Sequence, residues 1–152
     1  MNSVRVFLTT FLIIALALPV GSSAQGRMKR GGSSGWGMGS DYNRIYDPAT
    51  VETVTGEVVR VDKIVPARGI SYGIHLTLKT DTGTVSIHVG PAWYIENQDT
   101  KIAVRDRIEV KGSRVSFQGK PAVIAAEIRK GDEVLTLRDS LGFPLWSGWR
   151  RR

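Results

Sequence analysis

The chain has 152 residues, no cysteine and a formal net charge of +7. This length fits one domain that can bury a core without cross-links, and the lack of cysteine excludes disulfides, a lipid-modified cysteine anchor and covalently attached haem. The positive charge is explained either by anionic partners or by a need for solubility, and charge alone does not distinguish the two.

The first 24 residues have the pattern of a secretory signal peptide. Arg5 gives a positive start, an apolar run follows over 6–20, and small residues lead to Ala24. The apolar run is shorter than the ~20 residues of a membrane-spanning helix, which favours cleavage after Ala24 over a retained anchor. We therefore expect a periplasmic or secreted protein, and chromosomal DNA is an unlikely partner in that compartment.

Residues 25–50 are predicted to be a linker and lead-in. Glycine and serine dominate 25–40, with a basic cluster at 27–30. Such a segment buries too little apolar area to offset the entropy of ordering it. Trp36 and Met38 are unusual in a spacer, and suggest docking on the domain or on a partner.

From residue 51 onward the sequence is typical of strands. β-branched residues over 51–65 predict a long strand, with Gly56 at a point where it could bend or bulge. Apolar and polar residues then alternate over 70–79 and again over 84–90. The turn at 81–83 joins these two runs into a hairpin with one apolar face.

A segment without strand periodicity separates this hairpin from the rest of the domain. Residues 91–101 predict a short helix or a structured loop, since Pro91 suits a first helical position. Strand patterns return at Arg107, over 122–128 and over 134–137, with turns at 118–120 and 130–132.

This order of elements predicts an all-β domain over 51–138, followed by a tail at 139–152. It resembles the OB-fold, a small Greek-key barrel with a helix or loop between its third and fourth strands, and implies five to six strands here. The matching motifs are Val54-x-Gly56-x-Val58 and Asp106-x-Ile108-x-Val110-x-Gly112. Arg105 departs from the pattern, since such barrels often have glycine at this position.

Several longer segments resemble a domain of exported bacterial proteins of the MamS and MamX type. They are DPATVETVTGEVV, GIHLTLKT, VSIHVGPAWYIENQ and the ending WSGWRRR. The resemblance implies a background of iron mineral or redox chemistry in a periplasm-like space. Family members that bind haem do so through Cys-x-x-Cys-His motifs, so no haem activity carries over to this cysteine-free chain.

The two histidines, His75 and His88, fall on the polar face of the predicted hairpin. A two-residue turn at 81–82 places them directly opposite each other, with Cβ atoms ~4.5–5.5 Å apart. Two imidazoles at that distance could share zinc, copper or iron, although a closed metal site takes three or four ligands. The alternative is a pair of solvated surface histidines.

The same polar face predicts a ligand-binding surface. The outer face around the second and third strands is the usual binding platform of OB-folds, and the alternative is an ordinary polar exterior. The predicted binding residues are His75, Thr77, Lys79, Ser86 and His88.

The tail combines aromatic and cationic residues. This composition is typical of contacts with a partner protein and of contacts with a membrane surface. The alternative packs Trp146 back on the barrel and leaves the arginines solvated. The predicted contact residues are Trp146, Trp149, Arg150, Arg151 and Arg152.

No catalytic motif is recognisable in the sequence: the histidines have no evident nucleophile, and no paired carboxylates or phosphate loop occur. We therefore expect a non-enzymatic binding or accessory module without a cofactor, which binds an acidic protein or an anionic ligand. Two alternatives stay open. One is a metal-handling protein that uses His75 and His88, and the other is a single-stranded nucleic-acid-binding OB-fold, which the compartment disfavours.

Overall fold

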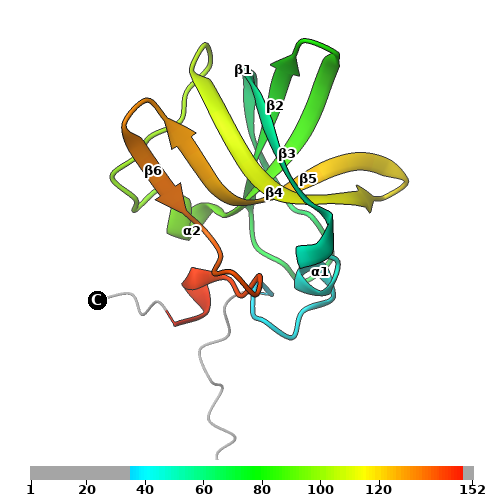
Figure 1. Cartoon of the computed structure of the whole chain (residues 1–152). Coiled ribbons are helices and arrows are strands. Elements are labelled where there is room, and N and C mark those ends of the chain that lie inside the picture. Colours follow the sequence, from blue (N-terminus) through cyan, green and yellow to red (C-terminus); the bar gives the residue numbers. More distant parts are fainter. Residues whose placement is uncertain (1–34, 149–152) are drawn as a thin grey trace, which may run out of the picture.

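Six strands follow the order β3-β2-β1-β4-β5-β6 in a computed structural model that describes residues 35–148 (Figure 1). The expected signal peptide and residues 25–34 of the expected linker lie outside the described residues. The strands are β1 (Val51–Ile64), β2 (Gly73–Thr80), β3 (Gly83–Pro91), β4 (Arg107–Phe117), β5 (Lys120–Lys130) and β6 (Glu133–Thr136). The helices are α1 (Asp41–Arg44), η1 (Pro48–Thr50), α2 (Ala92–Ile95) and η2 (Leu145–Gly148).

Neighbouring strands in this order are antiparallel, and one further pairing closes the barrel. Ser86, Ile87 and His88 of β3 pair in parallel with residues 122–124 of β5. The barrel thus runs 1-2-3-5-4-1, with α2 between the third and fourth strands and β6 as an added edge. This is the five-stranded Greek-key arrangement of an OB-fold, so the predicted fold class is confirmed.

Strand β1 belongs to both halves of the barrel. Its first half, from Val51 to Glu57, pairs with β4, and its second half pairs with β2. A Cβ atom on Gly56 would lie 2.3 Å from the carbonyl oxygen of Lys79, so only glycine allows the two backbones to approach at this crossing. The register shift follows at Val58–Arg60, which places the bend of the strand where the sequence predicted one.

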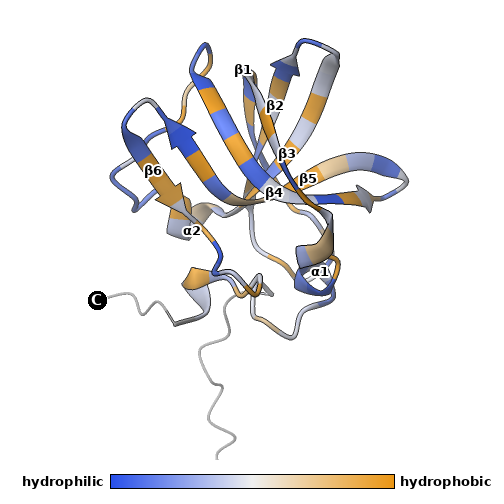
Figure 2. Ribbon diagram, in the orientation of Figure 1, coloured by the Kyte–Doolittle hydropathy of each residue, from blue (hydrophilic) through white to orange (hydrophobic). Residues whose placement is uncertain are grey.

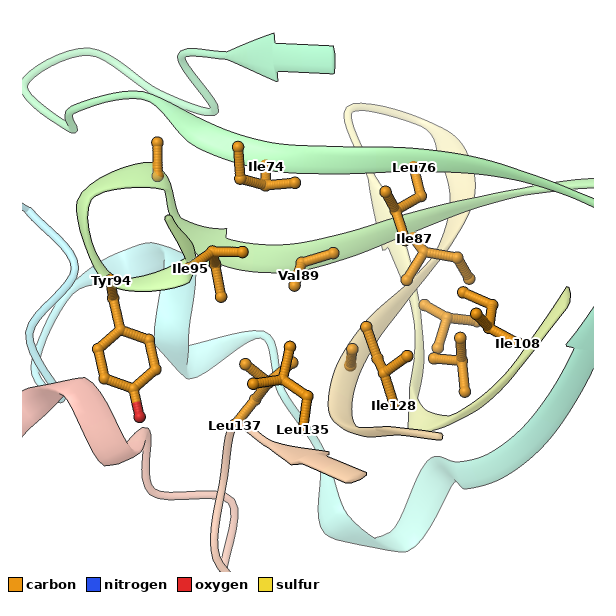
Figure 3. Close-up of a cluster of buried hydrophobic side chains, with 14 of the residues drawn as sticks. Ile74, Leu76, Ile87, Val89, Tyr94, Ile95, Ile108, Ile128, Leu135 and Leu137 are labelled. Carbon is orange, nitrogen blue, oxygen red and sulfur yellow. The ribbon is translucent and has the colours of Figure 1, made fainter. Parts of the chain in front are cut away.

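The barrel interior is filled by aliphatic side chains. Hydrophobic and hydrophilic residues alternate along much of β4 (Figure 2), as expected for a strand with one face inward. In Figure 3, Ile74 and Leu76 of β2 and Ile87 and Val89 of β3 point toward Ile108, Ile128, Leu135 and Leu137. Below this aliphatic cluster, Tyr94 of α2 extends toward the C-terminal segment.

A second buried group joins the two ends of the described chain. We call it the chain-end cluster, and it consists of Trp36, Tyr42, Asn43, Arg138 and Trp146, all at most 8% exposed. The indole Nε1 of Trp146 donates to the carbonyl of Trp36 (2.9 Å), and Trp36 is fully buried. The spacer expected up to residue 40 is therefore packed from Trp36 onward. Of the two alternatives for Trp36, docking on the domain is the one observed, while Met38 is half exposed.

Arg138 holds the chain-end cluster together. Its two terminal nitrogens donate to Asn43 Oδ1 (2.8 Å) and to the carbonyl of Gly142 (3.0 Å). Its guanidinium also lies over the rings of Tyr46 and Trp146, with the Cζ atom 4.8 and 5.1 Å from the ring centroids. Burial lowers the pKa of Arg138 to about 10, and the side chain stays charged at neutral pH.

Arg105 adopts a left-handed backbone conformation with φ of 77°. Its N–H donates to the carbonyl of Val58 (2.7 Å), which fixes the loop against β1. This conformation favours glycine, which explains why OB barrels often place glycine here and why Arg105 departs from that pattern at some cost in strain. Among residues 35–148, no helix is long and apolar enough to cross a membrane.

Candidate ligand-binding site

The two histidines face each other across β2 and β3, as the turn geometry predicts. His75 pairs with His88 in the strand register, and their ring centroids lie 3.8 Å apart with 28° between the ring planes. Both rings are buried, with 6% and 3% of their surface exposed. The alternative of two solvated surface histidines is therefore wrong, because the barrel's outer face is covered at this position.

Two aromatic residues from distant parts of the chain form this cover. Tyr42 of α1 stacks parallel to His88 at 5.9 Å, and its hydroxyl lies 2.8 Å from His88 Nδ1. Phe117, at the end of β4, makes an edge-to-face contact with the ring of His88, and the two ring centroids lie 4.7 Å apart. A hydroxyl that donates to Nδ1 places the proton of His88 on Nε2. The pair is therefore enclosed by α1 on one side and the β4–β5 hairpin on the other.

Enclosure keeps both imidazoles neutral. Burial, together with the nearby His88, lowers the pKa of His75 to about 3. Burial lowers the pKa of His88 to about 4. Burial also raises the pKa of Tyr42 far above its usual range, so that its hydroxyl remains a neutral hydrogen-bonding group. At neutral pH the site presents uncharged rings.

The stacked geometry does not favour a shared metal ion. The lone pair of an imidazole lies in the plane of its ring, and these two rings are stacked, with 28° between their planes and 3.8 Å between their centroids. Two ligand nitrogens must instead point at one centre ~2.0 Å from each of them. Within residues 35–148, no group of three or more His, Cys, Asp or Glu side chains gathers in a metal-binding arrangement.

A pocket of about 380 Å³ opens beside the histidines. This volume falls in the range of small-ligand sites. The pocket lies between the β2–β3 face, the second half of β1 and the β4–β5 hairpin. Its lining consists of Arg60, Ile64, His75, Thr77, Thr84, Val85, Ser86, His88, Phe117, Gln118, Lys120, Pro121 and Ala122.

One atom in this lining lacks a hydrogen-bond partner. His75 Nε2 is buried and makes no hydrogen bond within the protein. A buried polar group left unpaired costs about 1–3 kcal/mol, so native proteins rarely leave one without a reason. The same side chain is among the residues that line the adjacent pocket.

The structure brings together four of the five residues predicted for the ligand-binding face. His75, Thr77, Ser86 and His88 line the pocket, whereas Lys79 is exposed on β2 outside the lining. The sequence reasoning missed Arg60, Phe117 and Lys120, because they come from β1 and the β4–β5 hairpin. The turn at residues 118–120 was recognised, but its position against the β2–β3 face depends on barrel closure.

The hairpin that carries Phe117 and Lys120 is anchored to the connection between β1 and β2. Gln118 adopts φ of 50°, and its Nε2 donates to the carbonyl of Pro66 (3.3 Å) in the connection between β1 and β2. This contact joins the two loops that border the site.

The tail prediction needs one correction. Trp146 is 1% exposed and packs on Trp36 and Tyr94, with ring centroids 6.2 and 5.7 Å away. It is therefore part of the core and is not available as a partner contact. Its indole finds both apolar neighbours and a carbonyl acceptor inside the protein, which is the usual condition for a buried tryptophan. Trp149, Arg150, Arg151 and Arg152 lie outside the described residues.

Comparison with known proteins gives one family and several OB-fold structures. The model of the MamS/MamX magnetosome protein family matches residues 50–135. No curated protein sequence matches the chain. Among solved structures, a replication protein A heterotrimer bound to ssDNA is similar with 14% identity and a TM-score of 0.42, covering 55% of this chain and 59% of that one.

Two further structures are similar at the same level. The S. pombe Stn1-ten1 complex shows 12% identity and a TM-score of 0.43, over 55% of this chain and 59% of that one. The second OB-fold domain of replication protein A from Methanococcus maripaludis shows 22% identity and a TM-score of 0.40, over 55% and 85%. The chain thus spans less than two thirds of the length of the first two structures. The family match supports a binding or accessory domain.

Proposed function

Since the chain belongs to the MamS/MamX magnetosome protein family, we propose that it is an exported, non-catalytic module that binds an anionic ligand in the pocket beside His75 and His88. The observation that carries this proposal is the unpartnered Nε2 of His75, buried in the lining of a pocket of ligand size. A barrel that needed this histidine only for packing would gain stability from an apolar residue in its place.

The polar groups around the pocket favour an anion. Arg60 and Lys120 contribute positive charge, and Thr77, Thr84 and Ser86 contribute hydroxyl donors. No carboxylate is among the lining residues that the structure describes. The carboxylate of Asp62, outside the lining, pairs with Arg60 at 2.6 Å, which leaves Lys120 as the stronger anchor for a ligand.

The neutral histidines suit the same role. A neutral His75 that carries its proton on Nε2 can donate a hydrogen bond to a ligand without bringing a second buried charge. The exposed Lys120 then supplies the charge, and the β4–β5 hairpin supplies the wall. Export is supported by the signal pattern of residues 1–24, and a non-catalytic role by the lack of a recognisable catalytic set in the sequence.

Calorimetric titration of the purified chain from Gln25 onward tests the proposal. The probes are sodium phosphate and sodium citrate at pH 7.5 and constant ionic strength, with oligothymidylate and zinc chloride as probes of the two alternatives. We expect saturable binding of at least one of the two anions. Lys120→Gln and His75→Leu should each weaken it about tenfold, since each removes one directed contact.

Lys79→Gln is the matched control, because Lys79 lies on the same hairpin but outside the pocket lining. It should bind the anion as the parent does. An equal loss in Lys79→Gln and Lys120→Gln would show diffuse electrostatic attraction and refute a pocket site. Tight zinc or oligothymidylate binding without anion binding would favour the corresponding alternative.

A further inference from the structure

A rigid turn near the C-terminus carries an exposed apolar surface. We call Asp139–Phe143, together with Leu145, the apolar turn. Leu141, Phe143 and Leu145 are 68%, 44% and 42% exposed, and Leu141 is the most exposed large hydrophobic side chain among the described residues. Soluble proteins carry single exposed apolar residues without consequence, but three within five positions form a surface that indicates an interaction.

The turn is held in one conformation by its own hydrogen bonds. Asp139 Oδ1 accepts from the backbone N–H groups of Leu141 and Phe143, both at 2.9 Å. The backbone of Asp139 also pairs with Phe143 and Gly142 at 3.0 Å, and Arg138 donates to the Gly142 carbonyl. The only carboxylate of the turn is therefore engaged by backbone donors, and Leu141 is fixed outward at the tip.

The chain ends flank this surface. Trp36 and Trp146 are in contact, so the first described residues and η2 lie at the same end of the barrel (Figure 1). The chain before residue 35 and after residue 148 therefore continues from that end.

The net charge of the protein is concentrated in these ends. Residues 1–40 and 140–152 contain no Asp or Glu, and their basic residues are Arg5, Arg27, Lys29, Arg30, Arg150, Arg151 and Arg152. Residues 41–139 contain as many acidic as basic residues. The +7 charge of the chain thus lies entirely outside residues 41–139, and six of these charges remain in the chain from Gln25 onward, while the barrel is neutral.

From this arrangement we infer that the apolar turn docks on an anionic membrane surface. Leu141, Phe143 and Leu145 enter the interfacial region, and the basic residues of both ends contact anionic headgroups. An apolar tip on a chain whose two ends are basic in sequence suits a fluid bilayer, which needs no complementary cavity, better than the preformed surface of an acidic protein. This inference is independent of the pocket.

Vesicle sedimentation tests the inference with the chain from Gln25 onward, which keeps every described residue and removes the apolar run of the signal. Binding is measured on phosphatidylcholine vesicles with and without 30% phosphatidylglycerol, at low and high salt. We expect binding to the anionic vesicles only, and a loss of affinity at high salt. The double substitution Leu141→Ser/Phe143→Ser should weaken binding about tenfold.

The matched control is Val65→Ser/Val104→Ser, because both valines are 51% exposed in loops away from the turn. It should bind as the parent does, and thermal unfolding should show that both double variants remain folded. If the two double variants bind equally, or if the parent does not bind anionic vesicles, the inference is wrong. Salt-sensitive vesicle binding that is unchanged in Leu141→Ser/Phe143→Ser would show that charge alone attracts the protein to the headgroups, and would refute docking by the apolar turn.

Discussion

Two regions of this domain bury polar side chains in opposite ways. In the chain-end cluster, Arg138 brings a full charge into the interior, and the protein surrounds it with two acceptors and two aromatic rings. In the pocket, the histidines are neutral, yet His75 Nε2 has no partner. In the chain-end cluster a buried polar group joins distant segments, whereas in the pocket a buried polar group is left without a hydrogen-bond partner.

The difference assigns Arg138 to the stability of the fold and His75 to the proposed binding of a ligand. Arg138 Nε also lacks a hydrogen-bond partner, but its guanidinium is engaged at both terminal nitrogens and on ring faces. Such a group is expected to stabilise the fold. His75 lines an open pocket, and its unpaired atom is expected to reduce stability in the absence of ligand. Three measurements separate these roles.

The largest effect is expected from Arg138→Ala. The substitution leaves the Asn43 amide oxygen and the Gly142 carbonyl without their charged donor, and removes the packing of the buried stem. We expect the free energy of unfolding to fall by about 4 kcal/mol, measured by urea denaturation at pH 7.5. Arg129→Ala is the control, since Arg129 makes only an exposed pair with Glu127 and should cost less than about 1 kcal/mol. Equal losses would contradict the role of Arg138.

Acidification should destabilise the protein through the histidines. Their folded pKa values of about 3 and 4 lie below the 6.5 of the unfolded chain, so the unfolded state binds more protons below pH 6.5. Stability is therefore complete above about pH 7.5 and falls as the pH drops through 6.5 toward 4. Between pH 7.5 and 5.0 we expect a loss of about 3 kcal/mol by urea denaturation.

The control for this pH dependence is the double variant His75→Leu/His88→Leu. It should retain only the shallow dependence that other groups contribute. A parent protein whose stability is flat between pH 7.5 and 5.0 would show that the histidines are not buried in solution.

The smallest effect has the opposite sign. At pH 7.5, His75→Leu removes the unpaired nitrogen and should raise the free energy of unfolding by about 1 kcal/mol, while anion binding is lost. His88→Leu should instead be destabilising, because it leaves the buried Tyr42 hydroxyl without its partner. If His75→Leu is as destabilising as His88→Leu, then His75 serves the fold and the contrast with Arg138 disappears.

The sequence was sufficient for the barrel and for the histidine register. Turn chemistry at residues 81–82 and alternation along the two strands determine which residues are opposite one another, and both signals are local. The same alternation gave the wrong environment for His75 and His88, because it assumes that the polar face of a hairpin meets water. Tyr42 and Phe117 cover that face, and neither is near the hairpin in sequence.

The chain-end cluster was missed for the same reason. Glycine and serine around Trp36 indicate low local order. Local composition carries no information about the hydrogen bond that the Trp36 carbonyl accepts from Trp146, which is distant in sequence. Gly35 is an example of a glycine that packing requires. Its φ of 85° and its contact with the backbone of Ile70 leave no room for a side chain. Glycine here serves close packing, although the composition of the segment indicates a spacer.

The shared strand β1 has a consequence for folding kinetics. It is the first strand to be synthesised, yet Val51 pairs with Ser113 and Gly56 with Ile108, across more than a third of the chain. Pairings so distant in sequence raise the relative contact order, and proteins with high contact order fold slowly. The barrel cannot close before β4 and β5 are available, so β1 lacks its β4 partner until the chain has been synthesised as far as Phe117. For the export that we propose, this interval would keep the chain in the unfolded state that a translocation machinery threads.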